Sequence, residues 1–324
     1  MKKKIFGFFI IILIVFCIGA ITKYFKYIST KKIINFEMKI DKNSRIDNIL
    51  STISYQNKIF NKIYFNLNKK SNSIKKGYYL LSGSYCLNEI IDILNKGKVI
   101  KINVTIPEGL TLKEIEKILL DKKVIKSIKN FQNALKNIKN FPFKKFQNNY
   151  QGYFFPNTYR FHKYEQPSKV IGKFFRKFFK EFPPNLYKKK DEFYKAVILA
   201  SIIQKESPND IKMAEISSVF HNRIKIGMSL QSDVTIHFIL EKLFNKKKNR
   251  LLYKDLKIKS PFNTYLNRGY PPAPICNPGK TAIMAALNPA KTKYIYFLTT
   301  KNNEIKFSKS FIGHVKHKKE YLKK

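Results

Sequence analysis

The chain of 324 residues is long enough for one large domain or two modest ones, and 44% of its residues are hydrophobic, which is enough for a core. Length and composition therefore exclude a small disulfide-stapled scaffold and a wholly disordered chain. Lys and Arg number 64 against 21 Asp and Glu, giving a net charge of +43. Such a charge suggests a nucleic-acid ligand. However, only six of the basic residues are Arg, which a phosphate-binding surface favours, so we interpret the lysines as compositional drift and expect no nucleic-acid partner.

The cysteines and histidines form no framework. Cys17 lies in an apolar run, whereas Cys86 and Cys276 are far apart, so the sequence is compatible with one bridge between them or with free thiols. His314 and His317 stand three residues apart, with no acidic or cysteine neighbour at ligand spacing. We therefore expect no metal site and no cofactor.

The N-terminus has the composition of a membrane anchor. Three lysines precede an uninterrupted apolar stretch over residues 5–21, which is short for a spanning helix and long for the core of a signal peptide. Phe16, directly before Cys17, is incompatible with a lipoprotein cleavage box. We expect an uncleaved anchor, with a cleaved signal peptide as the alternative. Since no second run of spanning length follows, a single-pass protein is predicted.

After the anchor, hydrophobic periodicity predicts an α+β fold. Short strands and helices are expected, in chain order, at 33–40, 46–53, 77–83, 87–96 and 100–106. Asn88 is the predicted N-cap of the last of these helices and Gly97 its stop. Thr111 and Glu114 then form a capping box at the start of another helix. Residues 122–145 are predicted to form one Lys-rich exposed helix.

The second half of the chain is mainly helical. Helices are expected at 168–182, 193–207, 213–224, 281–287 and 310–321, a polar turn at 229–233, and a hairpin from 294–299 and 305–308. A proline-rich loop over 260–279 interrupts them, with five prolines among Asn, Thr and Tyr residues. Such a loop suits hydrogen bonding to a sugar, with Tyr265 or Tyr270 as a stacking face. A rigid surface loop is the alternative.

Glu206 is the residue that most strongly suggests chemistry. The helix over 193–207 is apolar until its last turn, and Pro208 is expected to end it. Burial and the partial negative charge at a helix C-terminus both raise the pKa of a carboxyl group, as general acid catalysis requires. An ordinary exposed Glu near a helix end is the alternative.

Several segments in register resemble the YceG-like family of endolytic peptidoglycan transglycosylases. They read IPEGLTLKEI, YQGYFFPNTYRF, LASIIQKES, SSVFHNRIKIGMSLQSDVT, SPFNTYLNRGYPPAPICNPG and AALNPAKTKYIYFLTT. The resemblance runs from about residue 35 to the C-terminus. It implies an anchor over 1–26, a LysM-like α+β subdomain over 33–106 and a YceG-like catalytic domain over 107–324.

The same resemblance implies a single-pass inner-membrane enzyme with its catalytic domain in the periplasm. It would cleave the β-1,4 bond between N-acetylmuramic acid and N-acetylglucosamine in nascent glycan strands, leave 1,6-anhydromuramic ends and so limit strand length. Glycan strands, the inner membrane and peptidoglycan synthases are the implied partners.

The family's catalytic Glu falls on Glu206, and the candidates for holding the sugar are Gln231, Asn263 and Tyr265. Asp233 could be a second carboxylate, although a cap of the polar turn fits it better.

Two positions depart from the family pattern, because Gln204 and Gln151 stand where members often carry Glu. We interpret both as supporting residues. A membrane-anchored, catalytically inactive peptidoglycan-binding scaffold is the alternative that these two amides leave open, and an anchored nucleic-acid binder is a third.

Overall fold

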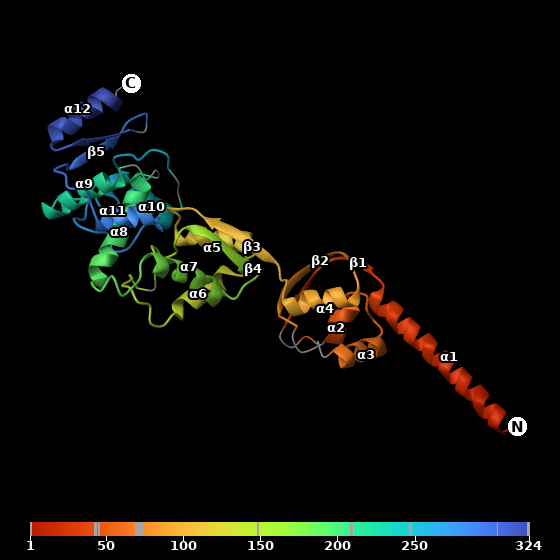
Figure 1. The fold of residues 1–324 in the computed structure, drawn as a ribbon. Helices are drawn as coiled ribbons and strands as arrows, with labels where there is room; N and C mark the ends of the chain where they lie inside the picture. The colour runs from red at the N-terminus through yellow and green to blue at the C-terminus, as the bar shows by residue number, and fades with distance from the viewer. Residues whose placement is uncertain are drawn as a thin grey trace. The chain divides into compact units, whose positions relative to one another are not determined.

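The protein is described from a computed structural model, shown in Figure 1. The described residues are 2–41, 44, 46–68, 74–147, 149–207, 210, 212–245, 248–302 and 304–322. They fall into two compact units, unit 1 (Met1–Ile102 with Phe161–Tyr164) and unit 2 (Asn103–Arg160 with Glu165–Lys324). Both units contain helices and strands, so the predicted α+β class and the N-terminal apolar helix are confirmed.

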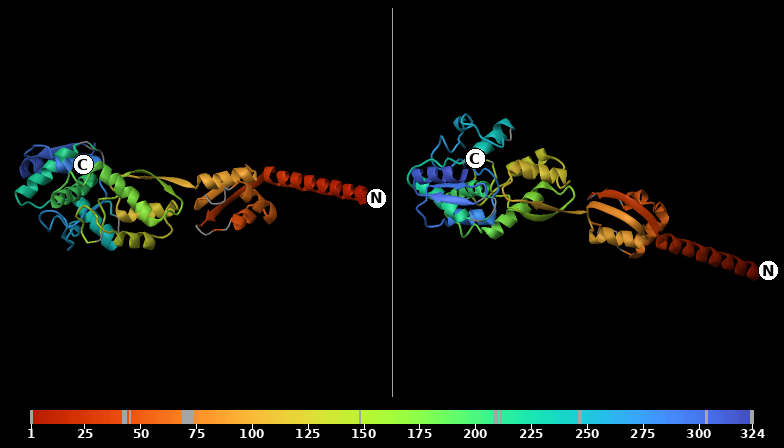
Figure 2. Two further views of the ribbon diagram at one scale, coloured as in Figure 1. Left: turned by 60° about the horizontal axis from the view of Figure 1, so that its bottom comes forward. Right: turned by 90° about the horizontal axis from the view of Figure 1, so that it is seen from above.

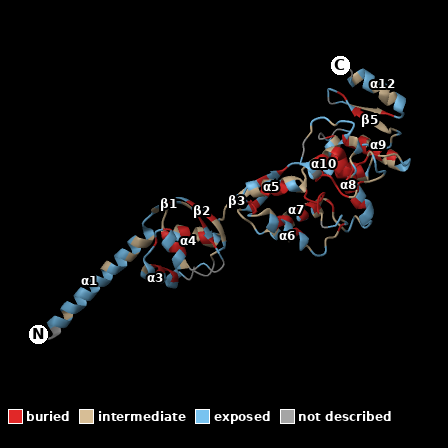
Figure 3. Ribbon diagram, turned by 180° about the vertical axis from the view of Figure 1, so that it is seen from behind, coloured by how far each residue is buried: buried red, intermediate tan, exposed pale blue. Residues whose placement is uncertain are grey.

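The N-terminal helix α1 (Lys2–Ser29) is continuous, as Figure 2 shows. Within its segment Lys4–Ser29 an 18-residue window reaches a mean hydropathy of 3.0, and the apolar side chains are exposed (Figure 3). At about 1.5 Å per residue these 26 residues extend roughly 39 Å, more than the ~30 Å of a bilayer's hydrocarbon core. The helix is thus compatible with a single-pass membrane anchor.

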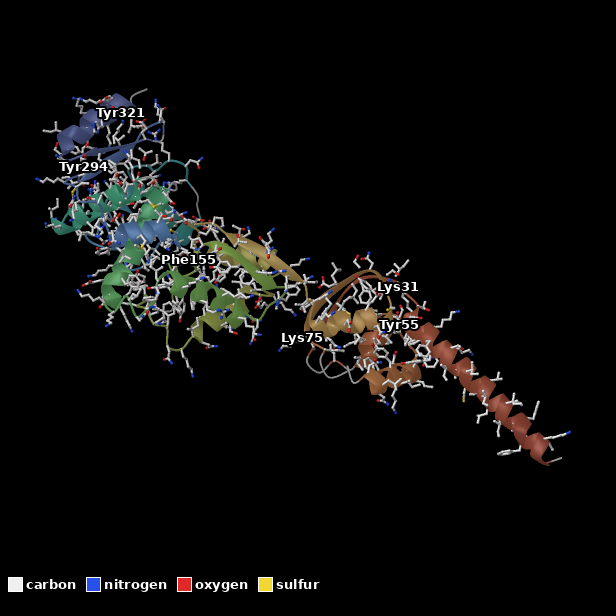
Figure 4. All side chains as sticks on the ribbon, viewed as in Figure 1. Lys31, Tyr55, Lys75, Phe155, Tyr294 and Tyr321 are labelled. Atoms are coloured by element: carbon white, nitrogen blue, oxygen red, sulfur yellow. The ribbon has the colours of Figure 1, made fainter. Side chains whose placement is uncertain are left out.

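The rest of unit 1 is a small α+β fold. It comprises β1 (Lys32–Ile40), α2 (Ile46–Thr52), α3 (Lys58–Asn68), β2 (Gly77–Tyr85) and α4 (Leu87–Lys96). The strands pair antiparallel, with Lys32 opposite Tyr85 and Ile40 opposite Gly77. Tyr55, labelled in Figure 4, is buried between the elements, and its hydroxyl donates to the carbonyls of Thr30 and Tyr85 at 3.0 and 3.1 Å. This core ties the end of α1 to the sheet.

The ends of α4 test the predicted caps. Gly97 stops the helix in the left-handed region at φ 66°, as predicted. The prediction of Asn88 as the N-cap is wrong: Cys86 holds that position, and its N–H donates to the Glu89 carboxylate at 2.8 Å. Asn88 lies inside the first turn, where its side chain instead accepts from the Tyr64 hydroxyl.

The next elements surround a sheet of two strands, β3 and β4, most of whose residues belong to unit 2. The elements are β3 (Lys101–Ile106), α5 (Leu112–Asp121), α6 (Ile128–Lys136), β4 (Asn157–His162) and α7 (Pro167–Glu181). The predicted capping box is confirmed, since Glu114 N–H donates to Thr111 Oγ1 at 3.3 Å and Thr111 N–H to Glu114 Oε2 at 2.8 Å. Strand β4 was not predicted.

The predicted long helix over 122–145 is wrong, because only α6 forms within it. Lys123 takes a left-handed conformation at φ 57°, and Ser127 starts a new helix by accepting from Asn130 N–H. After α6, Phe141 and Phe143 turn into an aromatic core, with ring centroids 4.9 Å from Tyr153 and 4.6 Å from Phe193 respectively. Burying these rings outweighs continuing a Lys-rich helix in water.

The remaining elements of unit 2 surround the central helix α8 (Lys190–Glu206). They are α9 (Met213–Lys225), α10 (Asp233–Phe244), a 3₁₀ turn (Asp255–Lys257), α11 (Lys280–Leu287), β5 (Tyr296–Thr299), β6 (Ile305–Ser308) and α12 (Phe311–Leu322). The predicted helices at 213–224 and 281–287, the antiparallel hairpin and the last helix are confirmed, whereas α10 was not predicted. Pro208, the expected helix stop, lies outside the described residues. Cys86 and Cys276 are free thiols.

Candidate active site

Glu206 is the last residue of α8, at the point where a buried helix reaches the surface. Every residue from Ala196 to Gln204 is buried, because α8 packs against α9, α10 and α11 (Figure 3). Lys205 is exposed and Glu206 is half-buried. The helix therefore presents one carboxyl group from an apolar support, as the sequence predicted.

The environment of Glu206 suits an acid that works near neutral pH. The pKa of its carboxyl group is raised to about 7, mainly by burial and in addition by the negative charge of Asp233. A hydrogen bond from Ser232 and the positive charge of Arg223 act in the opposite direction. A carboxyl group with this pKa is substantially protonated at pH 7 and can donate its proton.

Ser232 holds the carboxyl group in place. Its hydroxyl donates to Glu206 Oε1 at 2.5 Å, and its own N–H donates to Thr264 Oγ1 at 3.1 Å. The Thr235 hydroxyl completes the network, donating to Ser232 C=O at 2.7 Å and lying 2.9 Å from Thr264 Oγ1. Ser232, Thr235 and Thr264 are all buried. This network joins the polar turn, the start of α10 and the proline-rich loop at Glu206.

Asp233 and Tyr265 form a second pair beside the acid. The Tyr265 hydroxyl donates to Asp233 Oδ1. Burial, followed by this bond to a carboxylate, raises the pKa of Tyr265, so the hydroxyl stays protonated. Asp233 is thus engaged by Tyr265, which leaves Glu206 as the carboxyl group bound by Ser232.

Arg223 supplies a fixed positive charge. Its side chain is buried, Nε donates to Ile295 C=O at 2.7 Å, Nη1 donates to Leu230 C=O, and the guanidinium lies 5.3 Å from the centre of the Tyr296 ring. These contacts prevent it from moving onto Glu206, so its influence on the pKa of the acid is through space.

The three predicted sugar-holding residues occupy different environments. Gln231 is exposed next to Ser232, in a left-handed conformation at φ 48° that its N–H secures by donating to Thr264 C=O at 3.0 Å. Tyr265 is half-buried. Asn263 is fully buried and its amide donates to Leu256 C=O and Ile258 C=O at 2.9 and 2.8 Å. The surroundings of Asn263 favour a role in shaping the loop, whereas Gln231 and Tyr265 are accessible to a ligand.

Gln204 lies two residues before Glu206 on α8, in a polar layer below the site. Its Oε1 accepts from Gly279 N–H at 2.9 Å, and its amide also bonds to the Glu108 carboxylate. Burial and the charge of Asp210 raise the pKa of Glu108, against the effect of the Gln204 bond. A Cβ at position 279 would lie 1.9 Å from Glu108 Oε1, so the carboxylate needs a glycine there.

Gln151 links the proline-rich loop to the start of α5. Its amide donates to Pro274 C=O at 2.8 Å, while its Oε1 accepts from Leu112 N–H at 3.0 Å. A neutral amide makes both bonds at once, whereas an ionised carboxylate cannot donate. Gln151 and Gln204 therefore each have defined partners that use the chemistry of an amide.

Four residues of this region were missed or undervalued in the sequence. They are Glu108, Arg223, Ser232 and Asn277. Arg223 carried a signal, because it is one of only six arginines in a Lys-rich chain. Ser232 lay in the predicted polar turn, but nothing in its local pattern showed that it faces Glu206.

Two further features bear on the location of chemistry. Among the described residues, no group of three or more His, Cys, Asp or Glu side chains is arranged to hold a metal ion. A groove of about 680 Å³ lies between α6 and α7, but none of its lining residues belongs to the network around Glu206. The carboxyl chemistry of unit 2 is therefore assigned from Glu206 and its partners, not from a cavity.

Comparison with known proteins agrees with this architecture. A sequence model of the YceG-like family matches residues 38–320. The chain is 34% identical over 280 residues to the endolytic murein transglycosylase of Bacillus subtilis, covering 80% of this chain and 76% of that protein. It is 26% identical over 266 residues to the endolytic murein transglycosylase of Streptococcus pneumoniae serotype 2, covering 71% of this chain and 47% of that protein.

A solved structure gives the same result at the level of the fold. The crystal structure of a protein described as yceG-like from Listeria monocytogenes superposes with a TM-score of 0.58 at 28% sequence identity, covering 88% of this chain and all of that one. With a family match over most of the chain and a relative above 30% identity, the chain belongs to the YceG-like family.

Proposed function

We propose that this protein is an endolytic lytic transglycosylase that acts on the glycan strands of peptidoglycan, with Glu206 as its catalytic acid and base. The bond cleaved would be the β-1,4 bond between N-acetylmuramic acid and N-acetylglucosamine. The observation that carries this proposal is a half-buried carboxyl group with a pKa of about 7, held by Ser232, at the end of α8.

One carboxyl group is sufficient for this reaction. Ordinary glycosidases use two, one as the acid and one as the base or nucleophile. In a lytic transglycosylase, protonated Glu206 gives its proton to the glycosidic oxygen as the bond from the muramic C1 breaks. The sugar's own C6 oxygen then bonds to C1, and the Glu206 carboxylate takes the C6 hydroxyl proton. Water is not consumed, and the product ends in 1,6-anhydromuramic acid.

The neighbours of Glu206 fit supporting roles in this scheme. Ser232 would orient the carboxyl group of Glu206. The positive charge of Arg223 would favour the Glu206 carboxylate, which forms between the two steps. Gln231 and Tyr265 are proposed to contact the sugar, and Asn263 to shape the loop that carries Tyr265. Mass spectrometry of digested glycan strands tests the proposal, since it distinguishes anhydro ends from the reducing ends left by hydrolysis.

The pH dependence of cleavage is expected to follow Glu206. The first step requires the protonated acid, so kcat/KM should fall as the pH rises through about 7. The Ser232 bond lowers the pKa of Glu206 and the Asp233 charge raises it. Ser232→Ala should therefore move the alkaline limb to higher pH, and Asp233→Asn should move it to lower pH. Profiles of kcat/KM for the three proteins measure both shifts. If the alkaline limb moved in the same direction in both variants, this electrostatic assignment would be contradicted.

We further propose that residues 33–106 form a LysM-like subdomain and residues 107–324 the catalytic domain. In this proposal α1 anchors the protein in the inner membrane, with the catalytic domain in the periplasm. The lysines before the apolar run support an N-terminus in the cytoplasm. This placement would bring Glu206 to nascent strands and to the peptidoglycan synthases that make them.

A reporter fused after Lys324 is expected to be active only when it is of the kind that folds in the periplasm. The same fusion with a reporter active in the cytoplasm should be silent. The opposite pattern would contradict both the topology and the substrate.

A further inference from the structure

Helix α3 in unit 1 exposes an apolar stripe. Ile59, Ile63 and Leu67 are 71%, 39% and 71% exposed. They are spaced four residues apart, so they lie along one side of the helix, here called the α3 stripe. The other side of α3 buries Asn61, Tyr64 and Phe65. The fold of unit 1 is thus complete without the α3 stripe, which has no cover within the described residues of its own unit.

The N-terminal half of α3 is fixed to the end of the anchor helix. The Phe60 ring lies 5.7 Å from the Tyr24 ring and 5.3 Å from the Tyr27 ring. The Tyr27 hydroxyl donates to Asn61 Oδ1 at 2.9 Å. Figures 1 and 2 show α3 beside the C-terminal end of α1. The depth of α3 relative to a membrane is therefore set by α1.

That depth corresponds to the headgroup layer. The apolar run of α1 ends at Ile21. At 1.5 Å per residue, Tyr24 and Tyr27 lie roughly 4.5 and 9 Å beyond it along the helix axis. The headgroup region extends about 5–7 Å on each side of the hydrocarbon core. With the apolar run of α1 in the hydrocarbon core, Phe60, which contacts both tyrosines, would lie at the membrane surface, with Ile59 and Ile63 near it on the helix.

The charges around the α3 stripe match the same location. Lys58 and Lys62 are exposed on α3, and Lys23 and Lys26 on the adjoining part of α1. An apolar stripe flanked by lysines is typical of helices that lie in a membrane interface, where the lysines reach anionic headgroups. Long lysine side chains can do so while their stems remain on apolar surface.

We propose that α3 lies in the membrane interface, with the α3 stripe inserted between the headgroups, so that unit 1 is held against the bilayer and does not hang from α1 alone. This inference rests on the proposed membrane anchor and does not depend on catalysis. The partner is a lipid surface containing anionic headgroups.

The chain contains no tryptophan, which allows a direct test. Full-length Ile63→Trp is reconstituted into phosphatidylcholine–phosphatidylglycerol vesicles, with or without bromine on the upper acyl chains, and its fluorescence is measured. Ile59→Trp provides a second reporter on the same stripe. The matched control is Leu80→Trp, which replaces a side chain that is 58% exposed on β2. Leu80 lies five residues along β2 from Tyr85, or roughly 16 Å, and Tyr85 pairs with Lys32 beside the end of α1.

Brominated lipid is expected to quench the tryptophans of Ile63→Trp and Ile59→Trp at least about twofold more than that of Leu80→Trp, because bromine acts only at the depth of the inserted stripe. Equal quenching at all three positions would overturn the inference. Flotation of the chain with the vesicles tests the anchor separately, and loss of flotation would overturn anchor and inference together. Cleavage by the Trp variants, measured in parallel, reports folding and the proposed function independently of lipid contact.

Discussion

Replacement of Glu206 by Gln is expected to reduce cleavage of glycan strands about 10²- to 10⁴-fold, the usual contribution of general acid–base catalysis. Gln keeps the size of the side chain and can still accept the bond from Ser232, but it has no proton to transfer. Folding and glycan binding should therefore persist. The measurements are the initial rate of product formation, resolved by mass spectrometry, together with binding of the variant to intact strands.

Asp233→Asn is the matched control, because it also replaces a carboxylate by an amide in the same region. Its effect should be milder, since Asp233 is engaged by the Tyr265 hydroxyl. Near-normal cleavage by Glu206→Gln would refute the mechanism. Binding of glycan strands without cleavage by the wild type would instead favour the inactive, glycan-binding alternative. Reducing ends in the wild-type product would indicate hydrolysis and would assign Asp233 the role of a second catalytic carboxylate.

Local signals in the sequence predicted much of the fold. Thr111 and Glu114 form a capping box, and Gly97 stops another helix. Each of these two features involves residues within about one turn of one helix end, so a short stretch of sequence is enough to predict it. The long helix over 122–145 failed for the converse reason. Its end depends on Phe141 and Phe143, whose partners Tyr153 and Phe193 are brought close only by the tertiary fold.

The candidate site divides in the same way. Glu206 could be selected from the sequence because an apolar helix ending in a carboxylate is a local pattern. Ser232 could not be assigned, because it is 26 residues away and meets Glu206 only through its own contacts with Thr264. Asn263 was selected by residue type alone. A sequence cannot show that an amide is buried with both its donor and its acceptor engaged by nearby backbone.

The buried polar side chains below Glu206 explain how the proline-rich loop is held in one conformation. Gln204 accepts from Gly279 N–H and Gln151 donates to Pro274 C=O, both in that loop, whereas Asn277 belongs to the loop and donates to Leu110 C=O in the segment after β3. Because the loop has no regular secondary structure, its buried N–H and C=O groups depend on such side chains. The loop that carries Tyr265 is therefore held by the amides of Gln204 and Gln151 and by its own Asn277. Its prolines also restrict the unfolded chain.

Asn277 is the centre of this layer, and its replacement is expected to have the largest effect on stability. Its side chain is fully buried, and its Oδ1 accepts from Gly152 N–H and Phe154 N–H at 2.8 and 3.0 Å. Its Nδ2 donates to Leu110 C=O at 2.9 Å. Gly152 is closely packed, since at φ 96° a Cβ there would lie 2.8 Å from Pro274 and Val197.

Asn277→Ala leaves two buried N–H groups without an acceptor, at about 1–3 kcal/mol each. The free energy of unfolding should fall by about 3 kcal/mol, which lowers Tm by roughly 6–12 °C in a domain of this size. Thermal unfolding measures the global effect, and hydrogen exchange at Gly152 and Phe154 should accelerate in step with it. Asn133→Ala removes an exposed amide from α6 and should change Tm little. Equal Tm values for the two variants, or unchanged exchange at Gly152 and Phe154, would show that the hydrogen bonds of Asn277 do not hold this layer together.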